Sequence, residues 1–210
     1  GTQTLSNKTI DATQLTGTIT PSDNTVTLAK LTATGTQDAT TFLRGDNTFA
    51  TVVSGLTEAD QWRLSANFDI PTSATTVTSW EISDEPSYST LGTGMTESSG
   101  VFTFPSTGYY LVTFIGQVFS TDYNSTNAIV YIQATIDNST YNDVSLGWIG
   151  YKGGANPISR TTTSCSAIID VTDTANVKVR FRASDNDSVT IGLEGNTNTN
   201  YTSATFIKLG

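Results

Sequence analysis

Apolar and polar residues alternate along most of the chain after residue 55, a period typical of strands with one buried face. The segment 176–183 shows the pattern clearly. One of its faces carries Val177, Val179 and Phe181, and the other carries Lys178, Arg180 and Arg182. Similar stretches, separated by turns rich in Asn, Asp, Ser and Gly, predict strands at residues 76–82, 100–104, 108–120, 128–137, 144–152, 160–171, 176–184, 188–195 and 201–210. So many short strands predict an all-β sandwich or jelly roll.

The segment 108–120 departs from this pattern because both of its faces are apolar. The two faces are lined by Tyr109, Leu111 and Ile115 and by Tyr110, Val112 and Phe114. A strand of a single sandwich has only one face against the core, so the second face needs another cover. An identical subunit is the simplest cover, and we therefore expect a homo-oligomer.

The first 53 residues have a different character. Their only aromatic residues are Phe42 and Phe49, which is too little apolar bulk for a globular core. Three stretches, residues 14–20, 25–37 and 48–57, alternate Thr with aliphatic residues around Gly. This recurrence predicts short strands and turns that need neighbouring copies of themselves to bury their aliphatic side. A disordered linker is the alternative.

The composition narrows the possible functions. Charged residues make up only 14% of the chain, and the formal net charge is -9. An acidic chain without a basic block disfavours nucleic acid and anionic membrane surfaces as partners. The chain contains no His, which removes Ser-His-Asp catalysis, the common zinc sites and imidazole pH switching. We expect no enzymatic activity, and a glycosidase that uses two carboxylates is the alternative.

The single cysteine, Cys165, cannot form an intrachain disulfide, and its alternation with Ala167 and Ile169 predicts a small core residue. No apolar run is long enough to span a bilayer, and no signal-peptide pattern is present. Because the sequence begins at Gly1, we expect a fragment, a processed product or a remnant of expression.

The segment GVFTFPSTGYYLVTF, residues 100–114, resembles the globular-head family shared by the first complement component and the tumour necrosis factor-like proteins. The resemblance rests on Gly100, Phe102, Pro105, Gly108, Tyr109 and Tyr110. It continues through AIIDVTDTANVKVRF and the final strand YTSATFIKLG, so that it covers about residues 60–210. It implies a jelly roll of about ten strands that assembles as a tight trimer and serves recognition without catalysis. On this basis, the candidate trimer-interface residues are Tyr109, Tyr110, Val112, Phe114 and Phe206.

No collagen repeat of Gly at every third residue precedes this head. The Thr- and Gly-rich N-terminal segment instead resembles stretches of bacteriophage fibre proteins, in which a phrase like Phe-Leu-Arg-Gly-Asp-Gly-Thr-Trp recurs. Here the phrase is FLRGDNTF, residues 42–49, with Asn47 and Phe49 in place of the commoner residues. Together the two halves resemble a trimeric virion fibre with an extended stalk, residues 1–55, and a globular head, residues 56–210.

Four aromatic residues lie in or beside Asn- and Gly-rich stretches and are candidates for receptor binding. They are Tyr123, Tyr141, Trp148 and Tyr151. An exposed ring can cover the apolar side of a sugar while Asn and Asp bind its hydroxyls, although ordinary packing is the alternative for each ring. The row Lys178, Arg180 and Arg182 has two similar interpretations. It could bind an anionic cell-surface sugar, or it could pair with neighbouring carboxylates within or between subunits.

Two further motifs have both a functional and a structural interpretation. Asp185 and Asp187 could supply oxygen ligands to a calcium ion, or they could belong to a plain turn. The tripeptide Arg44-Gly45-Asp46 could bind an integrin, or Gly45 and Asp46 could form a turn with a local ion pair to Arg44. Apart from calcium, no cofactor is expected.

These observations predict a homotrimeric virion fibre, of the tail or capsid, whose head recognises a glycan or protein of the host cell surface. Its other partners would be virion structural proteins, and its location would be the extracellular virion. One alternative is a secreted ligand or lectin of the complement or tumour necrosis factor type. The other is a capsid decoration with a purely structural role.

Overall fold

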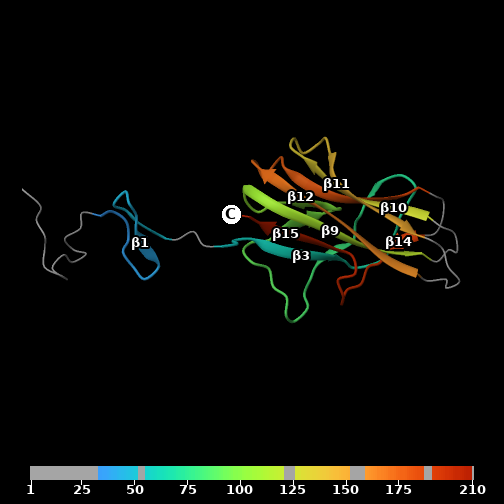
Figure 1. Cartoon of the computed structure of the whole chain (residues 1–210), viewed down its shortest axis with the longest axis horizontal. Coiled ribbons are helices and arrows are strands. Elements are labelled where there is room, and N and C mark those ends of the chain that lie inside the picture. The colour runs from blue at the N-terminus through green and yellow to red at the C-terminus, as the bar shows by residue number, and fades with distance from the viewer. Residues whose placement is uncertain (1–32, 52–54, 121–125, 152–158, 187–190, 210) are drawn as a thin grey trace, which may run out of the picture. The chain divides into compact units, whose positions relative to one another are not determined.

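The computed structural model describes residues 33–51, 55–120, 126–151, 159–186 and 191–209 (Figure 1). The chain divides into two compact units, residues 1–54 and 55–210. All regular structure in the described residues is β-strand, and among these residues no helix is long and apolar enough to cross a membrane.

The described part of the first unit is a hairpin of β1 (Thr41–Leu43) and β2 (Phe49–Thr51). The Asn47 N–H donates to the Arg44 carbonyl over 3.0 Å, and Asn47 has a φ of 61°. A residue in this left-handed conformation after a tight turn is a common way to close a hairpin loop, and Gly or Asn adopts it most easily. Asp46 accepts hydrogen bonds from the Thr48 N–H and hydroxyl and lies 3.5 Å from the Arg44 guanidinium. The expected turn with a local ion pair is therefore confirmed.

The second unit, the head, is a sandwich of two antiparallel sheets (Figure 1). The seven-stranded sheet has the order β4 (Phe68–Asp69), β14 (Ile191–Leu193), β9 (Gly108–Ser120), β15 (Ser203–Lys208), β3 (Ala59–Leu64) and β6 (Trp80–Ile82), with β12 (Ser159–Val171) paired to β9. The six-stranded sheet has the order β11 (Asn142–Tyr151), β10 (Thr126–Thr135), β13 (Lys178–Asp185), β8 (Val101–Thr103) and β7 (Thr96–Ser98), with β5 (Thr75–Thr76) paired to β13. The sandwich predicted from the alternating pattern is confirmed.

An aromatic cluster fills the space between the two sheets. Phe114 of β9 and Phe206 of β15 come from one sheet, and Phe102 of β8 and Phe181 of β13 come from the other. The Phe114 and Phe181 ring centroids are 4.7 Å apart, and those of Phe102 and Phe206 are 5.1 Å apart. Burial of one such side chain contributes about 1.5–3 kcal/mol, so this cluster holds the two sheets together.

The sequence pattern located the long strands better than the short ones. The strand predicted at residues 108–120 is β9, and the one predicted at 160–171 is β12 within one residue. The short strands β3 and β7 have no counterpart among the predicted strands. The buried side of β3 begins with a carboxylate, Asp60, which hides the alternation. Conversely, the segment 76–82 breaks into β5 and β6 near Ser79, which has a φ of 68°.

Candidate functional site

The central strand β9 turns its even-numbered residues into the core. Tyr110, Val112 and Phe114 are at most 1% exposed within a single chain, and so is Phe206 of the neighbouring strand β15. Their side chains are enclosed by the two sheets of their own sandwich and are not available to a second subunit. The prediction that these four residues line a trimer interface is therefore wrong, because the sequence could not show which apolar face of β9 is internal.

The odd-numbered residues of β9 form the centre of an apolar surface on the outer side of the seven-stranded sheet. Leu111 is paired with Ile168 of β12 on one side and with Ile207 of β15 on the other, so three strands contribute one continuous row. Ile168 is 64% exposed, and Tyr109, at the end of β9, is 54% exposed. We call Tyr109, Leu111, Ile115, Ile168 and Ile207 the outer patch.

Uncharged residues surround the outer patch on β9, β12 and β15, and a charged cluster begins on the next strand, β3, where Arg63 is paired with Ser203. The remaining outward positions of the three strands are Thr113, Gln117, Phe119, Thr162, Ser164, Ser166, Ser203 and Thr205. Charges appear on β12 only at the ends of this face. Asp170 pairs with Tyr109 at one end, and Arg160 lies opposite Phe119 at the other, where it forms an ion pair with Glu194. An apolar centre, few charges and a polar margin are the composition of a protein interface.

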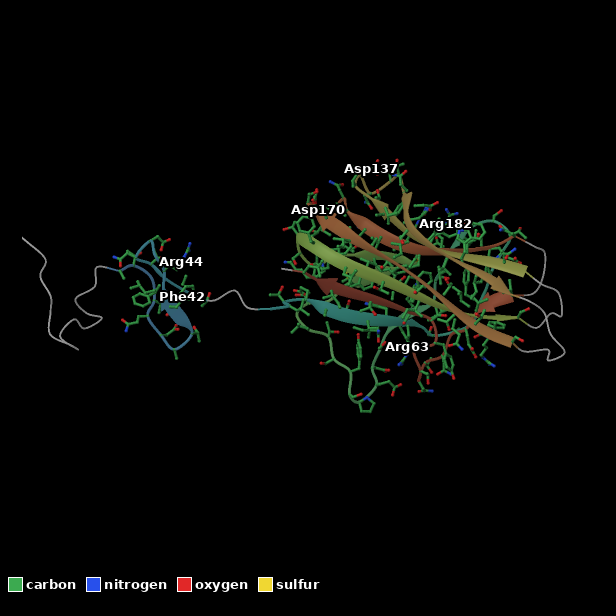
Figure 2. The ribbon with its side chains drawn as sticks, viewed as in Figure 1. Phe42, Arg44, Arg63, Asp137, Asp170 and Arg182 are labelled. Atoms are coloured by element: carbon green, nitrogen blue, oxygen red, sulfur yellow. The ribbon has the colours of Figure 1, made fainter. Side chains whose placement is uncertain are left out.

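The six-stranded sheet carries the cationic row on its outer face. Lys178, Arg180 and Arg182 are half-buried, while the intervening residues of β13 face the core. Figure 2 shows Arg182 on the opposite side of the head from Arg63, which lies on β3 of the other sheet. Among the described residues, the ion pairs involve Arg44, Arg63 and Arg160, and no carboxylate lies within 4.0 Å of the cationic row. Pairing with carboxylates of the same subunit is therefore absent from the described part of the head, and pairing with carboxylates of another subunit stays a prediction.

The structure does not bring the candidate receptor-binding aromatics together. Trp148 of β11 is 59% exposed on the outer face of the six-stranded sheet. Tyr141 precedes the other end of β11, and its ring lies under the Arg180 guanidinium, 4.0 Å from the ring centroid. Tyr123 and the side chain of Tyr151 lie outside the described residues. The structure describes the side chains of Tyr141 and Trp148, and of these two Trp148 has the exposed ring.

The candidate calcium ligands do not form a described site. Asp185 is 1% exposed at the end of β13, and its backbone N–H donates to the Pro71 carbonyl. Asp187 lies outside the described residues. No group of three or more His, Cys, Asp or Glu residues that could hold a metal ion occurs in the described part of the chain. Asp185 is thus enclosed, and because Asp187 lies outside the described residues, the calcium interpretation stays a prediction.

Solved structures share the architecture of the head. The crystal structure of murine APRIL at pH 5.0 superposes with a TM-score of 0.50 at 12% sequence identity, covering 72% of this chain and 98% of that chain. The structure of Eiger TNF from S. frugiperda superposes with a TM-score of 0.49 at 13% identity, covering 72% of this chain and 92% of that chain. The head is a tumour necrosis factor-like jelly roll. No family model matches the chain, and no curated protein matches it.

A buried arginine that sequence reasoning missed fixes one edge of this jelly roll. Arg63 of β3 is 1% exposed and donates to Glu81 over 2.8 Å and to Glu85 over 3.3 Å, and it also pairs with Asp84. The three carboxylates come from one short segment that starts in β6, so the arginine holds that segment to the sheet. The acidic residues between positions 81 and 85 could have indicated that an arginine pairs with this segment.

A buried carboxylate on the same strand was also missed. Asp60 is 3% exposed, and its Oδ2 atom accepts from the Met95 N–H over 2.7 Å and from the Trp62 indole over 3.0 Å. Its Oδ1 atom has no hydrogen-bond partner among the described residues. Burial raises the pKa of Asp60, and the charge of Glu58 adds to this effect. The adjoining space is lined by Glu58, Met95, Tyr110 and Phe206 among others.

The single cysteine follows its prediction. Cys165 is 7% exposed within the core, and burial raises the pKa of its thiol to about 11. A thiol with so high a pKa stays protonated at neutral pH and is unreactive.

Proposed function

We propose that the chain is a homotrimeric virion fibre of a bacteriophage, and that its jelly-roll head recognises the surface of the host cell. The observation that carries the trimer is the outer patch. It joins β9, β12 and β15 into one apolar, uncharged surface, and its central row is Ile168, Leu111 and Ile207. Water contact at such a surface is unfavourable, and a closed ring of identical subunits removes it.

The trimer gives a simple mechanism for recognition. Three identical heads on one assembly present three copies of any binding surface, so weak individual contacts combine into tight attachment. Such a mechanism needs no deep pocket. It also needs no catalytic group, and we propose that the chain is not an enzyme.

The first unit supports the fibre assignment. The phrase at residues 42–49 forms the β1–β2 hairpin, and Asn47 occupies a left-handed position that suits the commoner Gly of the phage phrase equally well. Phe42 and Leu43 are 45% and 41% exposed in this hairpin. Neighbouring copies of the hairpin in a trimeric stalk would cover them.

Sedimentation of the full chain and imaging of virions test the proposal. At micromolar concentration we expect a species of about three times the chain mass of 22.3 kDa. Antibodies raised against the chain should label fibres on phage particles, and the labelled chain should bind host bacteria. A chain that sediments as a stable single copy would contradict the trimer, and particles without label would contradict the virion assignment.

A second candidate is a secreted ligand of the tumour necrosis factor-like type, which the fold of the head favours. This function predicts the same trimer but a protein receptor on animal cells. Saturable binding of the full chain to animal cells, with no binding to bacteria, would favour it over the fibre.

A further inference from the structure

The cationic row of β13 is an electrostatic exception in an acidic protein. The chain has 10 Lys and Arg residues against 19 Asp and Glu residues, yet three of its cations occupy alternate positions of one strand. Lys178, Arg180 and Arg182 consequently share the outer face of the six-stranded sheet, about 7 Å from one to the next along the strand. Like charges at this spacing repel one another, so an anionic partner at this face would be favourable.

The described partners of the row are neutral. The Lys178 ammonium donates to the Thr103 hydroxyl over 3.3 Å, and the Arg180 Nε atom donates to the Gln133 amide oxygen over 2.7 Å. The Arg182 guanidinium donates to the Ala74 carbonyl. These bonds hold the side chains in place but leave their charges uncompensated.

One carboxylate is connected to the row indirectly. Asp143 accepts from the Gln133 amide nitrogen over 2.6 Å, and Gln133 in turn accepts from Arg180. Partial burial, followed by the charge of Arg182, lowers the pKa of Arg180, while the charges of Tyr141 and Asp143 act in the opposite direction. A guanidinium group is always protonated in proteins, so the row is electropositive, and its hydrogen bonds fix the two guanidinium groups before any ligand arrives.

An apolar platform lies beside the row on the same face. In the register of the sheet, Arg182 is paired with Tyr131 of β10, and Tyr131 is paired with Leu146 of β11. Trp148, two residues further along β11, is 59% exposed, and Leu146 is 47% exposed. Trp148 is in register with Ser184, two residues from Arg182 along β13, so roughly 12 Å separates the two backbone positions at the usual strand spacing and rise. A short oligosaccharide spans such a distance.

We propose that the outer face of the six-stranded sheet, formed by Arg180, Arg182, Leu146 and Trp148, binds an anionic polysaccharide. The Trp148 ring stacks on the apolar face of one sugar, and the guanidinium groups of Arg180 and Arg182 bind a carboxylate or sulfate of the neighbouring sugar. Charge complementarity selects this occupant over a neutral glycan, and the exposed ring selects it over a simple acidic peptide. The assignment rests on the proposed recognition function and names the class of surface molecule recognised.

The binding test uses the full chain and four polymers. The anionic polysaccharides are polygalacturonate, which carries carboxylates, and dextran sulfate, which distinguishes a preference for sulfate. Neutral dextran and polyglutamate are the controls for sugar without charge and for charge without sugar. We expect at least one of the two anionic polysaccharides to bind in a salt-dependent manner and clearly more tightly than both controls. Equal binding of polyglutamate, or no binding of either anionic polysaccharide, would overturn the assignment.

Matched variants separate this site from net charge. The double variant Arg180→Gln and Arg182→Gln should weaken binding by about tenfold or more, because it removes two charge-assisted contacts. The control pair Lys30→Gln and Arg44→Gln removes the same charge from the first unit and should change binding less than about twofold. Trp148→Ala should weaken binding several-fold, whereas Leu56→Ala, which shortens an exposed side chain outside the strands, should not. Equal losses in the two charge variants would mean that only net charge matters and would refute the site.

Sedimentation and cell binding distinguish failure of the polysaccharide site from failure of the proposed recognition function. The site variants should retain the mass of the parent chain, because the cationic row and the outer patch lie on different sheets. If the parent chain forms trimers and binds host bacteria but neither anionic polysaccharide, the site is wrong and the recognition function stands. If the parent chain neither forms trimers nor binds cells, the recognition function itself is wrong.

Discussion

Replacement of Ile168 by Asp should break the trimer while leaving each head folded. Ile168 lies at the centre of the outer patch on β12, where its side chain is 64% exposed in a single chain. Full burial of an Ile contributes about 1.5–3 kcal/mol, so covering the exposed part contributes about 1–2 kcal/mol in each subunit. Ile168→Asp removes this contribution and also places an unpartnered charge in the interface.

The effect multiplies because the interface is repeated by symmetry. Three copies of Ile168 together account for about 3–6 kcal/mol, and each 1.4 kcal/mol is a factor of about ten in a dissociation constant. The concentration at which trimers fall apart should therefore rise steeply. Sedimentation velocity from nanomolar to micromolar concentration measures this change directly.

The control is Ile136→Asp, which makes the same chemical change at a residue that is 81% exposed in the hairpin between β10 and β11. This variant should remain trimeric at every concentration tested. Far-ultraviolet circular dichroism and the urea midpoint of the head report whether either variant is unfolded. A folded Ile168→Asp chain that still sediments as a trimer at nanomolar concentration would refute the assignment of the outer patch as the subunit interface.

Three further predictions concern stability. Gly147→Ala should destabilise the head by about 1–3 kcal/mol in urea unfolding, because the added Cβ would lie 2.7 Å from the Ser164 carbonyl oxygen, whereas Gly150→Ala on the same strand meets nothing closer than 3.5 Å and should be tolerated. Asp60→Asn should stabilise the head more at pH 7 than at pH 4. The pKa of Asp60 is raised in the folded head, so ionisation of Asp60 makes the parent chain less stable as the pH rises, and Asn cannot ionise. If the variant and the parent chain differ in unfolding free energy by the same amount at both pH values, the prediction is contradicted. Asp137 accepts hydrogen bonds from the Thr140 and Ser139 N–H groups, which lower its pKa from 3.8, so its contribution is present above pH 3.8 and is lost as the pH falls below it. Asp137→Asn should accordingly lower the thermal midpoint at pH 7 and have little effect at the lowest pH at which the head is still folded. An equal effect at both pH values would contradict the stabilising role of the hydrogen bonds to the Asp137 carboxylate.

The candidate site shows where sequence reasoning stops. Trp148 was expected at an exposed recognition surface, and its ring is exposed on β11. Tyr141 was expected there for the same reason, but its ring is covered by Arg180, a residue 39 positions later in the sequence. The neutral partners of the cationic row, such as Gln133 and Ala74, come from other strands and loops. Contacts between distant segments of this kind leave no local pattern, so they could not be predicted.

The residue order alone determined the all-β class of the head and the long strands β9 and β12. It also determined which residues of each strand lie on the same face. These properties follow from the two-residue period of extended backbone, which is local and appears directly in the spacing of apolar side chains. Only the tertiary structure decided which face of β9 is internal. The alternation of Tyr109 and Tyr110 is consistent with either orientation, and the choice depends on Phe102 and Phe181, which reach β9 from the opposite sheet. That packing placed Tyr110 in the core and left Tyr109 outside, and so moved the proposed subunit interface to the other side of the strand.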